Sequence, residues 1–222
     1  QQQCPHLAAD TQCDLAIVGG GFTGLWTALE ARRRQPDARI VLVEAGLCGN
    51  AASGRNGGFC APSISHGVVN ALKRWPAEAE KLVQFGRSNL DDFVADLAEF
   101  GMSVEFEREG KVTVAEKPWQ IEGLQAQAEI HRRFGVKSEV LSWDALRERF
   151  NSPLYAAGLY EPNYATLNPG KMVAELRRWI RVRGLRIVGP SASALRRLPA
   201  ERASRIVWLP FSRRTPGHPR KS

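Results

Sequence analysis

A glycine-rich turn between an apolar run and an amphipathic segment constrains this chain more than any other part of its sequence. The run Asp14–Val18 has the length and aliphatic content of a buried parallel strand, and it leads directly into Gly19–Gly24, which reads GGGFTG. Apolar residues then recur at helical spacing until the arginines at 32–34, where cations suit the negative end of a helix dipole. Residues 39–43 predict a second strand, which ends at Glu44. Together these segments predict the strand–helix–strand unit that binds a dinucleotide.

The glycines and the terminal acid each have a physical role in such a unit. Gly19 permits the tight turn, Gly21 lets the backbone approach a pyrophosphate, and Gly24 lets helix and strand pack closely. The diphosphate would lie at the helix N-terminus, where free N–H groups favour an anion. Glu44, 20 residues beyond Gly24, can accept hydrogen bonds from both ribose hydroxyls and disfavours the 2′-phosphate of NADP. The alternative is a glycine-rich turn without a nucleotide, and the register of all four features argues against it.

The segment after Glu44 separates two cofactors that share this unit. Residues 45–59 read AGLCGNAASGRNGGF, which is too rich in glycine for a helix or a strand and predicts a long ordered loop. At the carboxyl ends of the first two strands, such a loop would lie over the nucleotide. Its small residues would let backbone amides reach a diphosphate or a flavin ring. The loop therefore favours FAD over NAD.

Three stretches of the sequence carry a family resemblance. The runs DLAIVGGGFTGLWTALEARRR, VLVEA and GNAASGRNGG resemble the D-amino-acid-oxidase-type superfamily of FAD-dependent oxidoreductases. Within it, the chain is most similar to the bacterial branch of gamma-glutamylputrescine oxidase-like amine and amino-acid oxidoreductases. The resemblance covers about residues 14–188. It implies that FAD contacts Gly19, Gly21, Phe22, Thr23, Gly24, Glu44, Ala45, Ser53, Arg55, Asn56, Gly57 and Gly58.

The resemblance also implies how the cofactor is held. Some members of the superfamily attach FAD covalently through a histidine in this loop or through a cysteine much later in the chain. No histidine lies between Ala45 and Phe59. We therefore expect non-covalent FAD and no metal.

The order of elements predicts an α/β fold, in which a Rossmann-like FAD-binding βαβ domain carries an inserted, incomplete α+β substrate domain. The expected division is an N-terminal extension at 1–13, a first FAD-domain segment at 14–85 and a partial substrate domain at 86–165. A return segment to the FAD domain follows at 166–189, and a basic tail rich in Pro and Arg, expected to be disordered, at 190–222.

Periodicity and capping residues predict the elements of the middle region. Ser88 is expected to cap a helix that Gly101 ends, and residues 104–107 and 111–115 are expected to pair as a β-hairpin around Gly110. The other expected elements are a helix opened by Pro118, a helix capped by Ser142, a strand at 154–160, a helix begun by Asn168-Pro169 and ended by Gly184, and a strand at 185–188.

Several aromatic and histidine side chains invite a functional interpretation that the residues alone do not support. Trp143, Tyr155, Tyr160 and Tyr164 could line an amine pocket, although such aromatics are more often core residues. His66 lies in a loop without an identifiable partner and is expected to be exposed at the surface or to have a structural role. His131 has polar neighbours on its helix and is expected to be solvated. We therefore name no catalytic side chain.

The net charge of +8 is unevenly distributed along the chain. Residues 1–170 contain 17 Lys and Arg against 21 Asp and Glu, whereas residues 171–222 contain 14 against 2. The basic end lacks the interleaved aromatics of a nucleic-acid groove, so nucleic acid is not an expected partner. A natural disordered tail is one explanation. The interpretation we favour is a truncation in which the last ~30 residues come from a shifted reading frame, since composition changes there.

Composition and cysteine spacing limit where the chain functions. No run of about 18 uncharged apolar residues exists, and the N-terminus shows neither part of a secretory signal, so we expect a cytoplasmic protein without a transmembrane segment. Cys4, Cys13, Cys48 and Cys60 form no CxxC pair and are expected to be reduced thiols. Cys4 and Cys13 could close a loop, but nothing in the sequence requires it.

The resemblance implies oxidation of a carbon–nitrogen bond in a small-molecule amine or amino acid. A hydride would pass to flavin N5, water would hydrolyse the resulting imine, and oxygen or a quinone would reoxidise the flavin. Two alternatives stay open. One is a truncated, catalytically inactive fragment of the FAD domain, and the weaker one is an NAD-dependent dehydrogenase.

Overall fold

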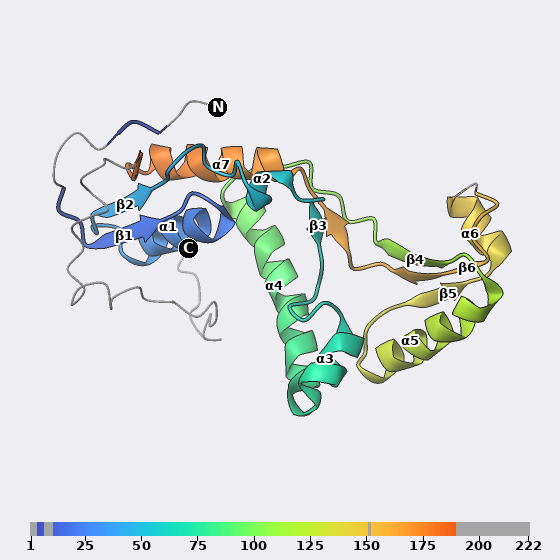
Figure 1. The fold of residues 1–222 in the computed structure, drawn as a ribbon. Coiled ribbons are helices and arrows are strands. Elements are labelled where there is room, and N and C mark those ends of the chain that lie inside the picture. The colour runs from blue at the N-terminus through green and yellow to red at the C-terminus, as the bar shows by residue number, and fades with distance from the viewer. Residues whose placement is uncertain (1–3, 7–10, 151, 190–222) are drawn as a thin grey trace, which may run out of the picture.

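The glycine-rich motif folds as the sequence predicts, into a parallel sheet with a crossover helix. The computed structural model describes residues 4–6, 11–150 and 152–189. Strands β1 (Leu15–Val18), β2 (Ile40–Val43) and β8 (Arg186–Val188) form a parallel sheet in the order β1-β2-β8. Because β8 comes from the end of the described chain, this sheet forms only after the intervening residues have returned to it (Figure 1). The predicted strand at 185–188 is thereby confirmed.

Two helices pack against this sheet and against each other. Helix α1 (Phe22–Arg34) follows the glycine turn, and α7 (Pro169–Val182) precedes β8. The N–H of Lys171 donates to the Asn168 side chain at 3.1 Å, which confirms the predicted start of α7. Gly184, at φ +74°, follows its last turn. The buried side chains between the two helices are Leu25, Ala28, Leu29, Met172, Val173, Leu176 and Ile180.

The loop predicted at 45–59 contains two short elements that the sequence did not indicate. Helix α2 (Ala52–Arg55) forms a single turn, and β3 (Phe59–Cys60) pairs with β7 (Ala165–Thr166). A Cβ on Gly54 would overlap the carbonyl oxygen of Gly49, so the helical turn packs directly on the preceding backbone. The partner of β3 lies about a hundred residues away in sequence, and local composition carries no signal of it.

A long helix lies between the lobe formed by the parallel sheet, α1 and α7 and a second lobe of the molecule (Figure 1). Helix α4 (Ala79–Glu99) begins more than two turns before Ser88, so the predicted cap is wrong. Buried Ala79 and Val83 extend the same apolar face toward the N-terminus, and a 3₁₀ turn at Pro76–Glu78 and helix α3 (Val68–Arg74) precede it.

The second lobe is an antiparallel sheet covered by helices. Strands β4 (Lys111–Ala115), β6 (Ala157–Glu161) and β5 (Glu139–Leu141) form it in the order β4-β6-β5. Helix α5 (Ile121–Arg133), after a 3₁₀ turn at Pro118–Gln120, packs on this sheet, and α6 (Trp143–Arg149) follows β5. The N–H of Ala145 donates to the Ser142 hydroxyl at 3.3 Å, as the predicted cap requires.

The predicted β-hairpin at 104–115 is wrong. Residues 104–107 do not pair with β4; instead Glu107 exchanges two backbone hydrogen bonds with Thr166, at 2.9 and 2.8 Å. Lys111 lies opposite Glu161 on β6, and the N–H of Gly110 donates to the Tyr164 carbonyl. Both halves of the expected hairpin therefore lie along the returning chain at 157–166, because that partner offers a longer ladder than a local turn.

Two further points concern the limits of the described chain. Among the residues that the structure describes, no helix combines the length and the apolar character needed to cross a bilayer. The tail expected at 190–222 lies outside the described residues, and the domain boundaries expected from the sequence stay predictions.

Candidate functional site

The glycine turn brings the end of β1 to the start of α1. Gly19 has φ +102°, a conformation that side chains disfavour, and its N–H donates to the Val43 carbonyl at 2.8 Å. A Cβ on Gly24 would overlap the carbonyl oxygen of Gly19, so the first turn of α1 lies directly on the glycine turn. Both glycines therefore have the structural roles expected from the motif.

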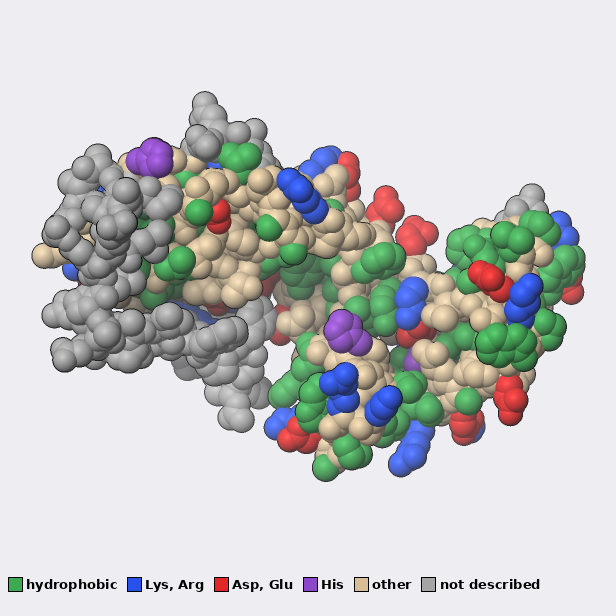
Figure 2. Space-filling model, viewed as in Figure 1, with side chains coloured by type: hydrophobic (Ala, Val, Ile, Leu, Met, Phe, Trp, Pro, Cys, Tyr) green, Lys and Arg blue, Asp and Glu red, His purple; other side chains and the backbone are tan. Residues whose placement is uncertain are grey.

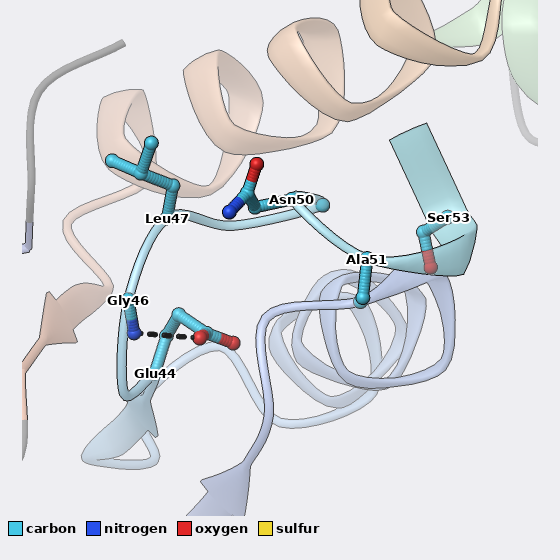
Figure 3. A pocket seen from close by; sticks show the side chains of 8 residues that line it. Glu44, Gly46, Leu47, Asn50, Ala51 and Ser53 are labelled. Carbon is cyan, nitrogen blue, oxygen red and sulfur yellow. Dashed lines mark hydrogen bonds between the residues drawn. The ribbon is translucent and has the colours of Figure 1, made fainter. Parts of the chain in front are cut away.

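The carboxylate of Glu44 is held by two backbone N–H groups. Gly20 N–H donates to one oxygen at 2.6 Å, and Gly46 N–H donates to the other at 2.8 Å, the bond drawn in Figure 3. Each oxygen keeps a further lone pair for an external donor. The sequence predicts an acid at this position, and the structure shows that the glycine turn orients its carboxylate.

A cavity of about 230 Å³ opens between the Glu44 carboxylate and the start of α1 (Figure 3). Most of its walls are backbone and small side chains from the loop after β2. The residues that line it are Gly21, Glu44, Gly46, Leu47, Gly49, Asn50, Ala51 and Ser53. Only a carboxylate and a few polar atoms face its interior, so it suits a ligand that carries hydroxyl groups and binds to backbone.

The N-terminus of α1 and the Ser53 side chain of α2 both face this cavity. The N-cap residue Gly21 has no side chain that could cap the helix. Instead, the hydroxyl of Ser53 accepts a hydrogen bond from the N–H of Phe22 at 2.9 Å. A hydroxyl that accepts through its oxygen can still donate its hydrogen. The free N–H groups and the helix dipole give this end of the cavity an affinity for anions.

The RNGG part of the loop is folded by its own polar side chains. Arg55 donates to the Asn50 side chain at 2.9 Å, and the Asn56 side chain donates to two carbonyls of α2 while accepting from Gly58 N–H at 2.8 Å. Gly58 has φ +73°, and a Cβ there would overlap the carbonyl oxygen of Leu167. The turn is therefore compatible only with glycine at this position.

A second cavity, of about 170 Å³, is lined in part by this turn and is mainly apolar. The rings of Trp26 and Phe93 pack edge to face on one wall, with centroids 5.9 Å apart. Its lining residues are Phe22, Trp26, Asn56, Gly58, Phe59, Cys60, Phe93, Leu167 and Met172. They come from α1, the loop, β3, α4 and the start of α7, so no local pattern in the sequence could have joined them.

The structure divides the predicted site residues into four groups. Gly21, Glu44 and Ser53 line the first cavity, and Phe22, Asn56 and Gly58 line the second. Gly19 and Gly24 shape the turn, whereas Thr23, Ala45, Arg55 and Gly57 line neither cavity. The lining residues that the sequence analysis missed in the first cavity are Gly46, Leu47, Gly49, Asn50 and Ala51, all inside the loop that it had singled out.

Three of the aromatics of the second lobe lie against cationic side chains, and none of the four lines either of the two cavities described above. Arg147 lies over the ring of Trp143, which is 43% exposed, and Arg149 lies over the ring of Tyr160. The ammonium of Lys111 lies 4.1 Å from the ring centre of Tyr164. These rings are covered by cations rather than packed in the core, so the core interpretation is also wrong for Trp143.

His131 is buried, which overturns the expectation that it is solvated. Its side chain is 2% exposed and lies between α5 and β6, with Nε2 4.0 Å from a Glu161 oxygen and 3.4 Å from the Gln127 amide. Lys111 pairs with the other Glu161 oxygen at 2.6 Å. Burial lowers the pKa of His131, and Glu161 opposes that shift. The polar neighbours along the helix hid this partner, which comes from a distant strand. His66, by contrast, is exposed as predicted.

Comparisons with known proteins agree with this geometry. The family model described as "FAD dependent oxidoreductase" (DAO) matches residues 14–218 and therefore extends past Val188, the end of the resemblance expected from the sequence. Gamma-glutamylputrescine oxidoreductase of Escherichia coli K12 is 28% identical over 182 residues, covering 81% of this chain and 42% of the relative. L-2-hydroxyglutarate dehydrogenase of Escherichia coli K12 is 26% identical over 178 residues, covering 79% and 39%.

A solved structure shows the same fold. Glycine oxidase from Bacillus cereus superposes with a TM-score of 0.63 at 20% identity, covering 80% of this chain and 46% of that one. The chain thus spans about two fifths of the length of the curated relatives it matches.

Proposed function

The chain belongs to the family of FAD-dependent oxidoreductases, and from that premise we propose that it binds FAD non-covalently as part of an enzyme that oxidises a carbon–nitrogen bond of an amine or amino acid. The observation that carries this proposal is the fixed carboxylate of Glu44, which faces the same cavity as the N-terminus of α1. A dinucleotide needs both an acceptor for ribose hydroxyls and an anion site, and the cavity offers the two together.

The residues of the first cavity fit the nucleotide part of FAD. Glu44 would bind the ribose, and Gly21, Phe22 and Ser53 would bind the diphosphate through backbone N–H groups and the Ser53 hydroxyl. Gly57 and Gly58 are proposed to lie against the ring system through their backbone. The remaining proposed contacts are Gly19, Thr23, Gly24, Ala45, Arg55 and Asn56.

FAD, when bound, supplies the acceptor for the hydride that leaves the substrate carbon. The described residues would supply position and electrostatics: Glu44 would hold one end of the ligand, and the α1 N-terminus would stabilise the charge of its phosphates. No side chain is proposed as general acid or base. The electron acceptor we propose is oxygen or a quinone. The substrate we propose is a small amine or amino acid, since two similar proteins are named for gamma-glutamylputrescine and for glycine.

A specific observation favours a second candidate, in which this chain binds the cofactor but does not turn over. The curated relatives are more than twice as long as the region they share with it. The catalytic activity is accordingly proposed for the whole protein, and the cofactor site for this chain.

An absorption spectrum of the purified chain tests the cofactor site. We expect flavin bands near ~375 and ~450 nm that survive gel filtration, and release of the flavin into the supernatant when the protein is precipitated with acid. Colour retained in the precipitate would contradict non-covalent binding. A colourless protein that FAD does not bind, but NAD does, would overturn the choice of cofactor.

A substitution at Glu44 tests the residue that carries the proposal. Glu44→Ala removes the acceptor of the ribose hydroxyls, and we expect FAD to bind at least about tenfold more weakly, since hydrogen bonds to a charged group contribute about 1.5–3 kcal/mol. Glu122→Ala, an exposed acid on α5 in the other lobe, is the matched control and should bind FAD like the parent chain. Equal affinity for all three proteins would remove Glu44 from the site.

A further inference from the structure

The N-terminal segment lies beside the last strand of the parallel sheet. Gly189 N–H donates to the Pro5 carbonyl at 2.7 Å, and His6 forms a parallel bridge with Gly189. This position brings Cys4 into contact with Cys48, and their sulfur atoms lie 4.0 Å apart. Both thiols are buried, at 6% and 0% exposure, and neither is oxidised. The loop considered between Cys4 and Cys13 is therefore not the pairing that the fold offers.

Cys48 lies at the back of the proposed cofactor site. Its neighbours in sequence, Leu47 and Gly49, line the first cavity. Its sulfur lies against Gly20, where an added Cβ would be 2.6 Å from it, and Gly49 N–H donates to the Gly20 carbonyl at 2.9 Å. Gly20 is also the residue whose N–H holds Glu44. A change at the Cys48 sulfur therefore acts directly on the backbone that positions the ribose-binding acid.

We propose that Cys4 and Cys48 form a redox-responsive thiol pair, whose oxidation by a hydroperoxide fastens the N-terminal segment to the cofactor loop and slows the release of FAD. The effect on FAD rests on the function proposed above, whereas formation of the disulfide does not. A disulfide has a sulfur–sulfur distance of about 2.0 Å, so the two atoms must approach by about 2 Å. The movement starts from sulfur atoms that are already in contact inside the fold.

The oxidation consists of two balanced steps. The Cys4 sulfur attacks the hydroperoxide, an S–O bond forms as the O–O bond breaks, and a sulfenic acid and one molecule of water (from hydrogen peroxide) result. The Cys48 sulfur then attacks the Cys4 sulfur, an S–S bond forms as the S–O bond breaks, and a second water leaves with the Cys48 proton. The two thiols lose two electrons and two protons in total, and the peroxide is reduced.

The surroundings of the two thiols set their order of reaction. Burial, together with the neighbouring Cys4, raises the pKa of Cys48 to about 12, against the opposing influence of Arg177. Cys48 is therefore a thiol at neutral pH and a poor first nucleophile. Cys4, at 6% exposure against 0% for Cys48, is the more accessible of the two residues and reacts first. Cys48 then resolves the sulfenic acid within the protein, because its sulfur lies 4.0 Å from that of Cys4.

The disulfide has a measurable consequence apart from the cofactor. It closes a loop between residues 4 and 48, which restricts the unfolded chain, and we expect Tm to rise by about 5–10 °C. The same bond holds Cys48, and with it the loop that lines the first cavity, against the N-terminal segment. We therefore expect the dissociation rate of FAD to fall by about threefold or more on oxidation, as expected when a binding loop becomes more rigid.

The experiment treats the full chain with hydrogen peroxide and then blocks the remaining thiols. Non-reducing peptide mapping should give one cross-linked peptide that contains Cys4 and Cys48, with the mass of two hydrogens lost, and dithiothreitol should reverse it. Cys4→Ser should abolish both the cross-link and the rise in Tm, and Cys4→Ala repeats this test if the serine variant does not fold. Cys13→Ser, the matched control at a half-buried thiol, should leave both unchanged.

Each other outcome contradicts part of the proposal. A bridge from Cys4 to Cys13, or oxidation that stops at Cys4 with Cys48 still alkylated, would overturn the thiol pair. A disulfide that raises Tm but leaves the FAD dissociation rate unchanged would overturn the link to the cofactor site. A chain that retains no FAD in either state contradicts the proposed function instead, while mass and Tm still decide whether the pair forms.

Discussion

The two lobes of this molecule place their polar side chains in opposite ways. In the first lobe, Glu44 and Ser53 are held by backbone N–H groups and face a cavity. In the second, Lys111, Glu161 and His131 hold one another beneath a helix and line neither of the cavities described above. Figure 2 shows the same contrast at the surface, where charged side chains of both signs gather on the second lobe and are sparse over the cofactor loop. Polar groups held by backbone stay available to a ligand, whereas polar groups that satisfy one another stabilise a fold.

The largest effect is expected from a side chain at Gly24 in the first lobe, and a helical glycine of the second lobe, Gly123, is its control. Gly24→Ala places a Cβ on the Gly19 carbonyl, and we expect it to lower the free energy of unfolding by about 3 kcal/mol and to abolish FAD binding. Gly123→Ala, on α5, meets no atom within 4 Å and should stabilise the chain by about 0.5–1 kcal/mol. Urea unfolding of both variants measures the difference. Similar values for the two would show that the glycine turn tolerates a side chain.

A smaller effect is expected from the buried ion pair of the second lobe. Glu161→Ala leaves the Lys111 ammonium, which is partly exposed, without its carboxylate and removes the acid beside His131, and we expect a loss of about 2–3 kcal/mol. FAD affinity should not change, because these residues line neither cavity. Glu129→Ala, which breaks an exposed pair with Arg132 on the same lobe, is the control and should change stability by less than about 1 kcal/mol. Weaker FAD binding in Glu161→Ala would contradict the division of roles between the lobes.

The contrast between the lobes also explains how far the sequence predicted the structure. The unit from Asp14 to Glu44 was predicted in full because its strand, turn, helix and acid are adjacent in the chain and each has a local cause. The hairpin at 104–115 was wrong because the true partner, residues 157–166, is distant in sequence. The burial of His131 was missed for the same reason, since the acid beside it is on β6.

The candidate site follows the same rule. Apart from Gly21, its first cavity is lined by Glu44 and the loop that follows it, so the sequence located the cavity even where it missed individual residues such as Asn50 and Ala51. The second cavity joins residues from several elements, and only Phe22, Asn56 and Gly58 among its lining had been predicted. Distance along the chain, rather than the strength of any motif, thus set the limit of prediction.

The pH dependence of the free energy of unfolding should reveal the contribution of the buried His131 in the second lobe. Burial lowers the pKa of His131 below its ordinary value of 6.5, so the unfolded chain binds a proton more readily than the folded one. This contribution to stability is complete above that pH and is lost as the pH falls below it. Urea unfolding at pH 7.5, 6.5 and 5.5 should therefore show a loss on acidification that His131→Gln reduces. Glu161 and Lys111 face the ring and remain in both proteins, so parallel pH profiles would mean that His131 does not cause the loss.

The smallest expected effect concerns the Ser53 hydroxyl at the start of α1. Ser53→Ala leaves the Phe22 N–H without this acceptor, and we expect a loss of about 1 kcal/mol in the free energy of unfolding without ligand, as for the removal of a helix cap. Addition of FAD should recover part of this loss, because a diphosphate oxygen would accept from the same N–H, and FAD affinity should fall only severalfold. Ser88→Ala, which removes an exposed hydroxyl on α4 that donates to a carbonyl of its own helix, is the control and should alter neither quantity by a comparable amount. If FAD recovers none of the lost stability in Ser53→Ala, the diphosphate does not lie at the α1 N-terminus. Glu44 would then be the sole support for the contrast between polar groups that face a ligand and polar groups that pair with one another.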